Sequence, residues 1–216
     1  MTDTISGIRS KKIITICRRL YGDDLLRLAE ALHKAGICHM EVTFDQSDSA
    51  GEEKTARAIS ALDERFGGEM EFGAGTVLTE RQVQIAKEAG AKFIISPNVN
   101  DEVIRTTLAE GLISIPGAMT PSEILHADRL GAQFVKLFPA GTLGLKYLKD
   151  VRAPISHVSL LATGGITEDN FGDFLAAGAA GAGISGRLTD KKCIEAGNFE
   201  ELTRRARAFM DIAGRY

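Results

Sequence analysis

The sequence predicts an α/β fold of the (β/α)₈ TIM barrel type, formed by a single domain. Short apolar segments alternate with helical patterns along the chain, and glycine recurs where a helix ends and the next apolar segment begins. Glycine just past a helix end supplies the left-handed residue that turns the chain into a strand. Short continuous apolar runs bounded by such turns are typical of buried parallel strands.

Eight segments are strand candidates, and each is short, apolar and bounded by turn residues. They cover residues 12–17, 39–44, 71–75, 92–96, 112–116, 133–138, 158–162 and 180–184. Helical patterns lie between them, as at residues 23–34 and 80–89. Eight alternating units with right-handed crossovers favour a closed barrel. A doubly wound open sheet is the alternative.

We expect all 216 residues to belong to this one domain, because no Pro-, Gly- or Ser-rich linker divides the chain. Gly90, Gly111 and Gly131 are only 21 and 20 residues apart, which leaves room for a strand, a helix and short loops between them. The barrel core is expected over about residues 12–190, with a C-terminal helix over about residues 199–213.

The composition restricts the classes of function. A formal net charge of −3 gives no basic field for nucleic acid or an acidic membrane. No apolar run has the length of a membrane span, and the first residues lack the apolar stretch of a secretory signal. Three cysteines without paired spacing favour a reduced, cytoplasmic location. The four histidines are scattered, so we expect no metal and no cofactor.

Lys136 is a charged residue in an otherwise apolar strand candidate. Alternation places Phe134, Lys136 and Phe138 on one face of the strand, near its C-terminal end, where barrel enzymes carry their active sites. If that face is the barrel interior, burial disfavours the ammonium, and the neutral amine is a nucleophile for carbonyl groups. The alternative is a lysine whose side chain reaches outward between the helices.

Glu41 lies in the second strand candidate, on the face opposite Met40, Val42 and Phe44. The apolar set is expected to face the helices, which leaves Glu41 and its neighbour Thr43 toward the barrel axis. A buried carboxylate beside a lysine serves either as a general base or only as an ion-pair partner, and the pattern alone favours neither.

Glycine-rich segments follow the last two strand candidates, at residues 162–166 and 181–186. Many TIM barrels bind phosphate at this place, through backbone N–H groups that glycine lets approach the anion closely. The alternative is that these glycines only form tight turns. The paired placement favours a phosphate or a similar anion.

Six motifs, in order and near the family's spacing, resemble the KDPG/KHG aldolase family. They stand at Glu41-Val42-Thr43, Gly73-Ala74-Gly75-Thr76-Val77-Leu78, Ile95-Ser96-Pro97, Ile115-Pro116-Gly117, Val135-Lys136-Leu137-Phe138-Pro139-Ala140 and Thr163-Gly164-Gly165-Ile166. The family consists of class I aldolases that cleave 2-keto-3-deoxy-6-phosphogluconate or 4-hydroxy-2-oxoglutarate. The resemblance extends from about residue 12 to residue 207. It implies a (β/α)₈ fold, no metal and commonly a homotrimer.

The resemblance implies the catalytic roles. The lysine that forms the Schiff base corresponds to Lys136, and the general acid/base corresponds to Glu41. The threonine that contacts the pyruvate carboxylate corresponds to Thr76.

The resemblance also implies the residues that surround the substrate. Pro97 and Phe138 correspond to residues that line the pocket. Gly164 and Gly165 belong to the segment that holds the phosphate, and Thr163 lies near the substrate hydroxyls.

Two positions depart from the family pattern. An arginine four residues after the glutamate often binds the keto-acid carboxylate, but Asp45 stands there and would repel that group. Arg18 is the expected substitute, because it leaves the first strand beside the second. The last phosphate contact, often Gly-Ser, reads Ser185-Gly186, which displaces the serine while its backbone donors remain.

The expected function is reversible cleavage of 2-dehydro-3-deoxy-6-phosphogluconate to pyruvate and glyceraldehyde 3-phosphate. Thr163, in place of an apolar residue before Gly-Gly, favours the gluconate over the galactonate epimer. One alternative is an aldolase for 4-hydroxy-2-oxoglutarate or another unphosphorylated keto acid. An alternative of a different class is a barrel that binds sugar phosphates without turnover.

Overall fold

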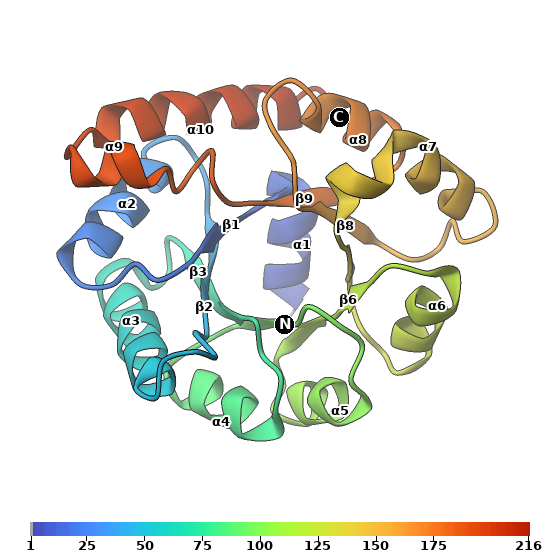
Figure 1. Ribbon diagram of the computed structural model, residues 1–216, viewed down its shortest axis with the longest axis horizontal. Helices are drawn as coiled ribbons and strands as arrows, with labels where there is room; N and C mark the ends of the chain where they lie inside the picture. The colour runs from blue at the N-terminus through green and yellow to red at the C-terminus, as the bar shows by residue number, and fades with distance from the viewer. Residues whose placement is uncertain (1) are drawn as a thin grey trace.

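The computed structural model describes residues 2–216. Its strands form a ring of parallel neighbours, and Figure 1 shows this ring with the helices around it. The strands are β1 (Ile13–Cys17), β2 (His39–Thr43), β3 (Glu71–Gly75), β4 (Phe93–Ile95), β5 (Ile113–Ile115), β6 (Gly117–Ala118), β7 (Val135–Leu137), β8 (Leu160–Thr163) and β9 (Gly181–Ile184). The single-domain barrel predicted from the sequence is confirmed.

The ring closes through the fifth strand candidate, residues 112–116, together with the two residues that follow it. Pro116 divides this stretch into β5, which pairs with β4, and β6, which pairs with β7. Proline has no N–H to donate, so the regular ladder is interrupted there. The Pro116 carbonyl still accepts from the Lys136 N–H at 2.9 Å, and the Ala118 carbonyl accepts from the Phe138 N–H at 3.1 Å. These bonds hold β7 against β6 and the proline that precedes it.

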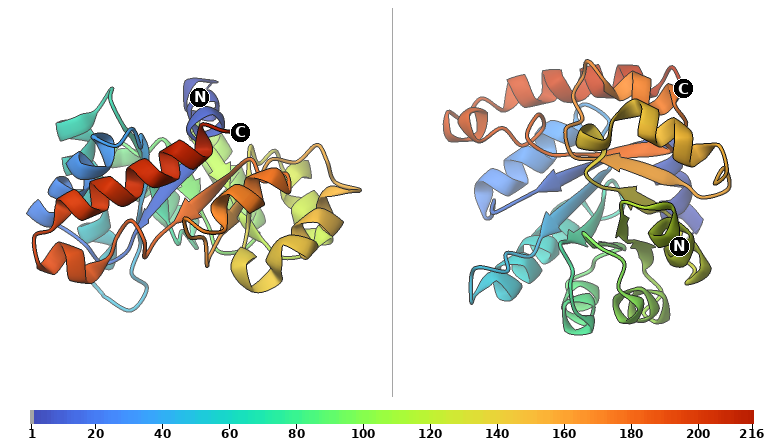
Figure 2. Two further views of the ribbon diagram at one scale, coloured as in Figure 1. Left: turned by 90° about the horizontal axis from the view of Figure 1, so that it is seen from above. Right: turned by 45° about the vertical axis from the view of Figure 1, so that its right-hand side comes forward.

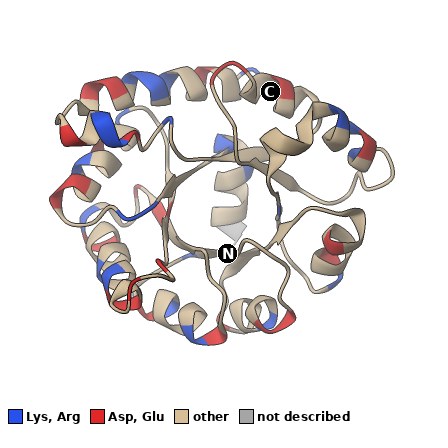
Figure 3. Cartoon of the chain, viewed as in Figure 1, with Lys and Arg blue, Asp and Glu red and all other residues tan. Residues whose placement is uncertain are grey.

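Helices cover the outside of the ring. They are α2 (Asp23–His33), α3 (Gly51–Phe66), α4 (Glu80–Glu88), α5 (Asp101–Ala109), α6 (Pro121–Arg129), α7 (Ala140–Arg152), α8 (Phe171–Ala176), α9 (Lys191–Glu195) and α10 (Phe199–Ala213). The turns out of α4 and α6 use Gly90 and Gly131, with φ of 98° and 96°, as the punctuation predicted. Figure 3 shows that charged residues are concentrated on these helices and their loops, with few on the strands.

Helix α1 (Thr2–Lys11) was not predicted, and it covers the N-terminal end of the barrel. Figure 1 shows it inside the outline of the ring, and Figure 2 shows it at one end. Ile8 of α1 is fully buried against the apolar layer inside the barrel. That layer contains Ile14, Phe93, Ile95, Ile113, Ile115, Phe134 and Leu161. With so few apolar residues, α1 gives too weak a helical pattern to be recognised from sequence.

Candidate active site

Lys136 lies on β7 and points into the barrel, on the same face as Phe134, and not outward between the helices. Phe134, two residues earlier, belongs to the interior layer, whereas Val135 and Leu137 pack toward the helices. The lysine is only 5% exposed, and its Nζ lies 4.8 Å from the centroid of the Phe138 ring. Burial lowers the pKa of Lys136, the Glu41 charge opposes this shift, and the Arg18 charge adds to it. The position therefore favours the neutral, nucleophilic amine.

Glu41 lies on β2 and shares the barrel interior with Lys136. It is 1% exposed, while Met40, Val42 and Phe44 pack toward the helices as expected. Burial raises the pKa of Glu41 to about 7, although Lys136 and Arg18 act in the opposite direction. Its Oε2 has no hydrogen-bond partner among the described residues. A carboxyl group in this state can both accept and donate a proton near neutral pH.

Glycine on β3 makes room for the Glu41 carboxyl group. A Cβ at Gly75 would lie 2.6 Å from Glu41 Cδ and 2.7 and 2.8 Å from its two oxygens. Real Cβ atoms do not approach other atoms this closely, so a larger residue would displace the carboxyl group. Gly75 was recognised in a motif but not as a site residue. Its requirement for space depends on the register between β2 and β3, which pairs Thr43 with Gly75.

Arg18 follows β1 and lies between two pockets at the C-terminal rim of the barrel. The β2-side pocket, of about 410 Å³, also contains Thr76. The glycine pocket, of about 270 Å³, also contains Phe138 and Thr163. The charge of Arg18 acts on both Glu41 and Lys136. Arg18 therefore lines both rim pockets and lies close enough to the two reactive side chains to influence their charges.

The glycine pocket brings together most of the predicted anion contacts. It is lined by Ile16, Arg18, Phe138, Thr163, Gly164, Gly165, Ile166, Thr167, Gly183, Ser185, Gly186 and Arg187. Gly183 is required on β9, because a Cβ there would lie 2.7 Å from Thr163 Oγ1. Arg187 lines the pocket but is bound by both oxygens of Glu168, at 2.8 and 3.0 Å. Arg18 is therefore the pocket's cation without a carboxylate partner among the described residues.

Pro97, like the buried Lys136 and Glu41, lines neither pocket. It follows β4, and its carbonyl oxygen would be 2.4 Å from a Cβ built on Gly117. Gly117 is paired in register with Lys136. Pro97 therefore packs against β6, the strand that is paired with β7 at Lys136.

Asp45 does not stand as a free charge at the rim. Arg19 Nε lies 2.7 Å from its Oδ2, and Arg19 Nη2 donates to its Oδ1 at 3.0 Å. The expectation that Asp45 repels a substrate carboxylate rested on an unpaired charge. The Arg19–Asp45 pair was not predicted, because it depends on the path of the chain after β1 and β2.

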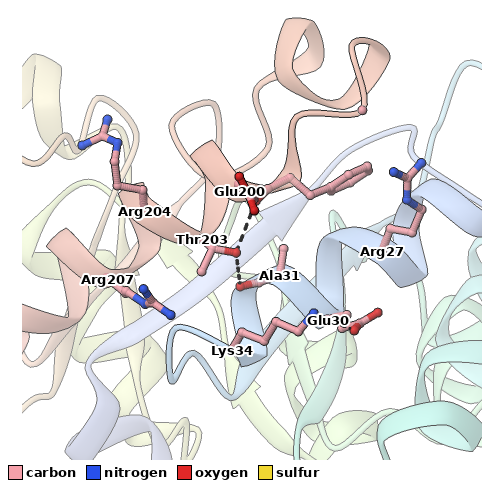
Figure 4. A pocket seen from close by; sticks show the side chains of 10 residues that line it. Arg27, Glu30, Ala31, Lys34, Glu200, Thr203, Arg204 and Arg207 are labelled. Carbon is pink, nitrogen blue, oxygen red and sulfur yellow. Dashed lines mark hydrogen bonds and ion pairs between the residues drawn. The ribbon is translucent and has the colours of Figure 1, made fainter.

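A further pocket, of about 490 Å³, lies between α2 and α10 (Figure 4). Its charged residues are partly paired with one another or with neighbours, as in the 2.8 Å contact between Lys34 and Glu30. Arg27 stacks on the Phe199 ring at 4.2 Å. None of the predicted site residues lines this pocket.

Within residues 2–216, no group of three or more His, Cys, Asp or Glu side chains is arranged to hold a metal ion. No helix in the same range is long and apolar enough to cross a membrane.

A TIM barrel with a buried lysine and a buried carboxylate beneath its C-terminal rim has the groups that a lyase of the class I aldolase type requires. The family model described as KDPG and KHG aldolase matches residues 4–205. The chain belongs to this family.

Characterised relatives carry the names of two epimer-specific aldolases. The 2-dehydro-3-deoxy-6-phosphogalactonate aldolase of Escherichia coli strain K12 is 32% identical over 177 residues, which cover 82% of this chain and 83% of the relative. The 2-dehydro-3-deoxy-phosphogluconate aldolase of Haemophilus influenzae is 32% identical over 209 residues, which cover 96% and 95%. The percentage identity is the same for the two relatives, so it does not distinguish between the two epimers.

Solved structures share the fold. A structure described as native KDPGal superposes with a TM-score of 0.84 at 30% identity, and the match covers 94% of this chain and 96% of the other. The KDPG aldolase of Legionella pneumophila, with pyruvate captured as a covalent carbinolamine, superposes with a TM-score of 0.83 at 28% identity and the same coverage. The enzyme class predicted from the sequence is confirmed.

Proposed function

We propose that the chain reversibly cleaves 2-dehydro-3-deoxy-6-phosphogluconate to pyruvate and glyceraldehyde 3-phosphate through a Schiff base on Lys136. The observation that carries this proposal is the buried amine of Lys136, whose pKa is lowered beside buried Glu41. The covalent pyruvate adduct in the Legionella pneumophila relative supports the same chemistry.

The proposed reaction begins at the amine. Lys136 Nζ attacks the C2 carbonyl of the keto acid to give a carbinolamine, which loses water to form an iminium ion. Glu41 takes the proton of the C4 hydroxyl, the C3–C4 bond breaks, and its electron pair moves into the iminium to give an enamine. The aldehyde is released. A proton then returns to C3, and water hydrolyses the iminium to release pyruvate and the free lysine.

The binding roles are proposed for the residues at the rim. Arg18 and Thr76 share the β2-side pocket and are assigned to the substrate carboxylate. Backbone donors of Gly164, Gly165, Ser185 and Gly186 are assigned to the phosphorylated end in the glycine pocket. In the same pocket, Thr163 is assigned to the substrate hydroxyls and Phe138 to the pocket wall. Pro97 is assigned to the wall behind Lys136.

Trapping with borohydride tests the Schiff base. Incubation with pyruvate and sodium borohydride should add one reduced pyruvate to the chain, and peptide mass spectrometry should place it on Lys136. Lys136→Met should give no adduct. Lys92→Met is the matched control, because Lys92 is half exposed and interacts with Asp63 outside the barrel. An adduct on another lysine, or none, would rule out the assigned nucleophile.

The substrate is tested by comparing the two phosphorylated epimers with 4-hydroxy-2-oxoglutarate. We expect the highest kcat/KM for the gluconate epimer. The pairing of Arg187 with Glu168 is the observation that favours the unphosphorylated alternative, since it removes one cation from the glycine pocket. Equal kcat/KM with and without the phosphate would establish that alternative. Complete lack of turnover would leave the binding barrel as the function.

We also propose a homotrimer in the cytoplasm. The resemblance to the family supports the trimer, and the three unpaired cysteines support a reducing compartment. Light scattering after size-exclusion chromatography, together with cell fractionation, tests these two assignments.

A further inference from the structure

Asp45 occupies the place where the family often carries a substrate-binding arginine, yet its carboxylate is fully engaged by neighbours. Its Oδ1 accepts from Ser47 Oγ at 2.7 Å, from the Ser47 N–H at 3.0 Å and from Arg19 Nη2 at 3.0 Å. Its Oδ2 contacts Arg19 Nε at 2.7 Å. Hydrogen bonds from Ser47 and then Arg19 lower the pKa of Asp45 to about 2. The group is therefore ionised and paired across the neutral range.

Arg19 has a backbone conformation that needs support. Its φ is 52°, in the left-handed region that costs about 1 kcal/mol or more for a residue with a side chain. Such a conformation persists where the surroundings hold it. The two-point contact with Asp45, together with a 3.0 Å bond from Arg19 Nη2 to Ser47 Oγ, holds the side chain on the loop after β2. This left-handed turn immediately follows Arg18.

The direction of Arg18 depends on that turn. Arg18 leaves the end of β1, lines both rim pockets and acts electrostatically on Lys136 and Glu41. A residue after a strand has no ladder to fix its backbone, so the next residue's contacts determine where it points. Those contacts are supplied by Arg19 and Asp45.

We propose that the Arg19–Asp45 ion pair is a positioning device that aims Arg18 at the keto-acid carboxylate and neutralises Asp45 at the same time. The inference rests on the proposed function. The residue that replaces the family's arginine thus contributes to carboxylate binding indirectly, through Arg18, and does not touch the substrate.

Steady-state kinetics of three variants test the proposal. Asp45→Ala should raise KM for the keto acid about tenfold while kcat changes less than about threefold, because a misdirected anchor weakens binding and leaves Lys136 and Glu41 in place. Arg19→Ala should raise KM further, since it also leaves Asp45 unpaired. Arg19→Ala combined with Asp45→Ala should return to the level of Asp45→Ala alone. A simple loss of packing would instead make the double variant the worst of the three.

A second cycle asks whether the effect passes through Arg18. Adding Asp45→Ala to Arg18→Ala should produce no further rise in KM. Independent, additive effects of the two substitutions would overturn the proposal. Asp48→Ala is the matched control, because Asp48 lies in the same loop but pairs with Lys54 at 2.6 Å. Its KM should equal that of the wild type.

Borohydride trapping with pyruvate separates this proposal from the proposed function. If the wild type forms no adduct on Lys136, the Schiff-base function fails and the kinetic proposal fails with it. If the wild type is trapped and turns over, but Asp45→Ala and Arg19→Ala leave KM unchanged, only the positioning role fails. Thermal unfolding of each variant verifies that the fold is retained.

Discussion

Burial acts in opposite directions on the two charged side chains inside the barrel. It disfavours the charged form of each group, so the pKa of Lys136 falls and the pKa of Glu41 rises to about 7. Lys136 and Glu41 do not form a salt bridge with each other, although the charge of Lys136 acts on Glu41. Burial therefore favours the neutral amine of Lys136, while the Glu41 carboxyl group transfers protons near neutral pH.

The pH dependence of kcat/KM should report this pair. The base in the proposed reaction is the deprotonated carboxylate, so the rate should rise as pH increases through an apparent pKa of about 7. Glu41→Gln should lower kcat by about 10²- to 10⁴-fold and abolish this acidic limb. Measurement of kcat/KM between pH 5 and pH 9 tests the expectation. An acidic limb near the ordinary glutamate pKa would contradict it.

Strands β3 and β9 contribute space to the site as well as backbone pairing. The interior of β3 is lined by glycine, and β9 places Gly183 against Thr163. Glycines on these strands let Glu41 of β2 and Thr163 of β8 occupy their places in the barrel. The site therefore depends on the absence of side chains at these glycines on the neighbouring strands.

Replacement of the β3 glycine should disturb catalysis more than folding. In Gly75→Ala, the new methyl group would overlap the Glu41 carboxyl group, which must rotate away, and kcat should fall about 100-fold. Gly172→Ala on α8 is the control, because its Cβ would meet neighbours no closer than 3.5 Å. Unchanged kcat in Gly75→Ala, with the fold intact by circular dichroism, would argue against this account.

Stability and function oppose each other in this protein. A carboxyl group whose pKa is raised on folding binds its proton more tightly in the folded state than in the unfolded chain. Stability is therefore lost as pH rises from the unfolded value of 4.5 to about 7, and it remains lost above that pH. The charge that catalysis requires is thus present when it destabilises the fold most.

Removing the charge should stabilise the protein at high pH only. Glu41→Gln should resemble the wild type near pH 4.5 and exceed its free energy of unfolding by about 1–3 kcal/mol at pH 8. Urea unfolding at the two pH values measures the difference. Glu53→Gln, at an exposed position on α3, is the matched control and should show no such change. A difference that is the same at both pH values would count against the burial of an ionised Glu41.

Regular repetition made most of the barrel predictable from sequence. The apolar runs and helix-ending glycines placed the strands. Alternation placed Glu41 toward the barrel axis and put Lys136 on one face with Phe134 and Phe138. Features without a repeating pattern escaped. Helix α1 carries too few apolar residues to stand out, and the division of the fifth strand at Pro116 appears only when both neighbours are known.

The rim of the site was harder to predict for a similar physical reason. Asp45 was interpreted by its charge alone, because sequence gives no distance to Arg19, 26 positions away. Loop residues are positioned by individual contacts, and no repeating sequence pattern predicts these contacts. Strand residues, in contrast, are positioned by a ladder whose register fixes every second side chain.

Within residues 2–216, helix α1 closes the N-terminal end of the barrel. Ile8 and the apolar layer above it block the N-terminal end, so whatever enters at the C-terminal rim must leave by the same route. In the proposed reaction, the pyruvate fragment is bonded to Lys136 and the aldehyde lies between it and the exit. The fold therefore imposes an ordered mechanism, in which the aldehyde is released before pyruvate. In the synthetic direction, pyruvate binds before the aldehyde.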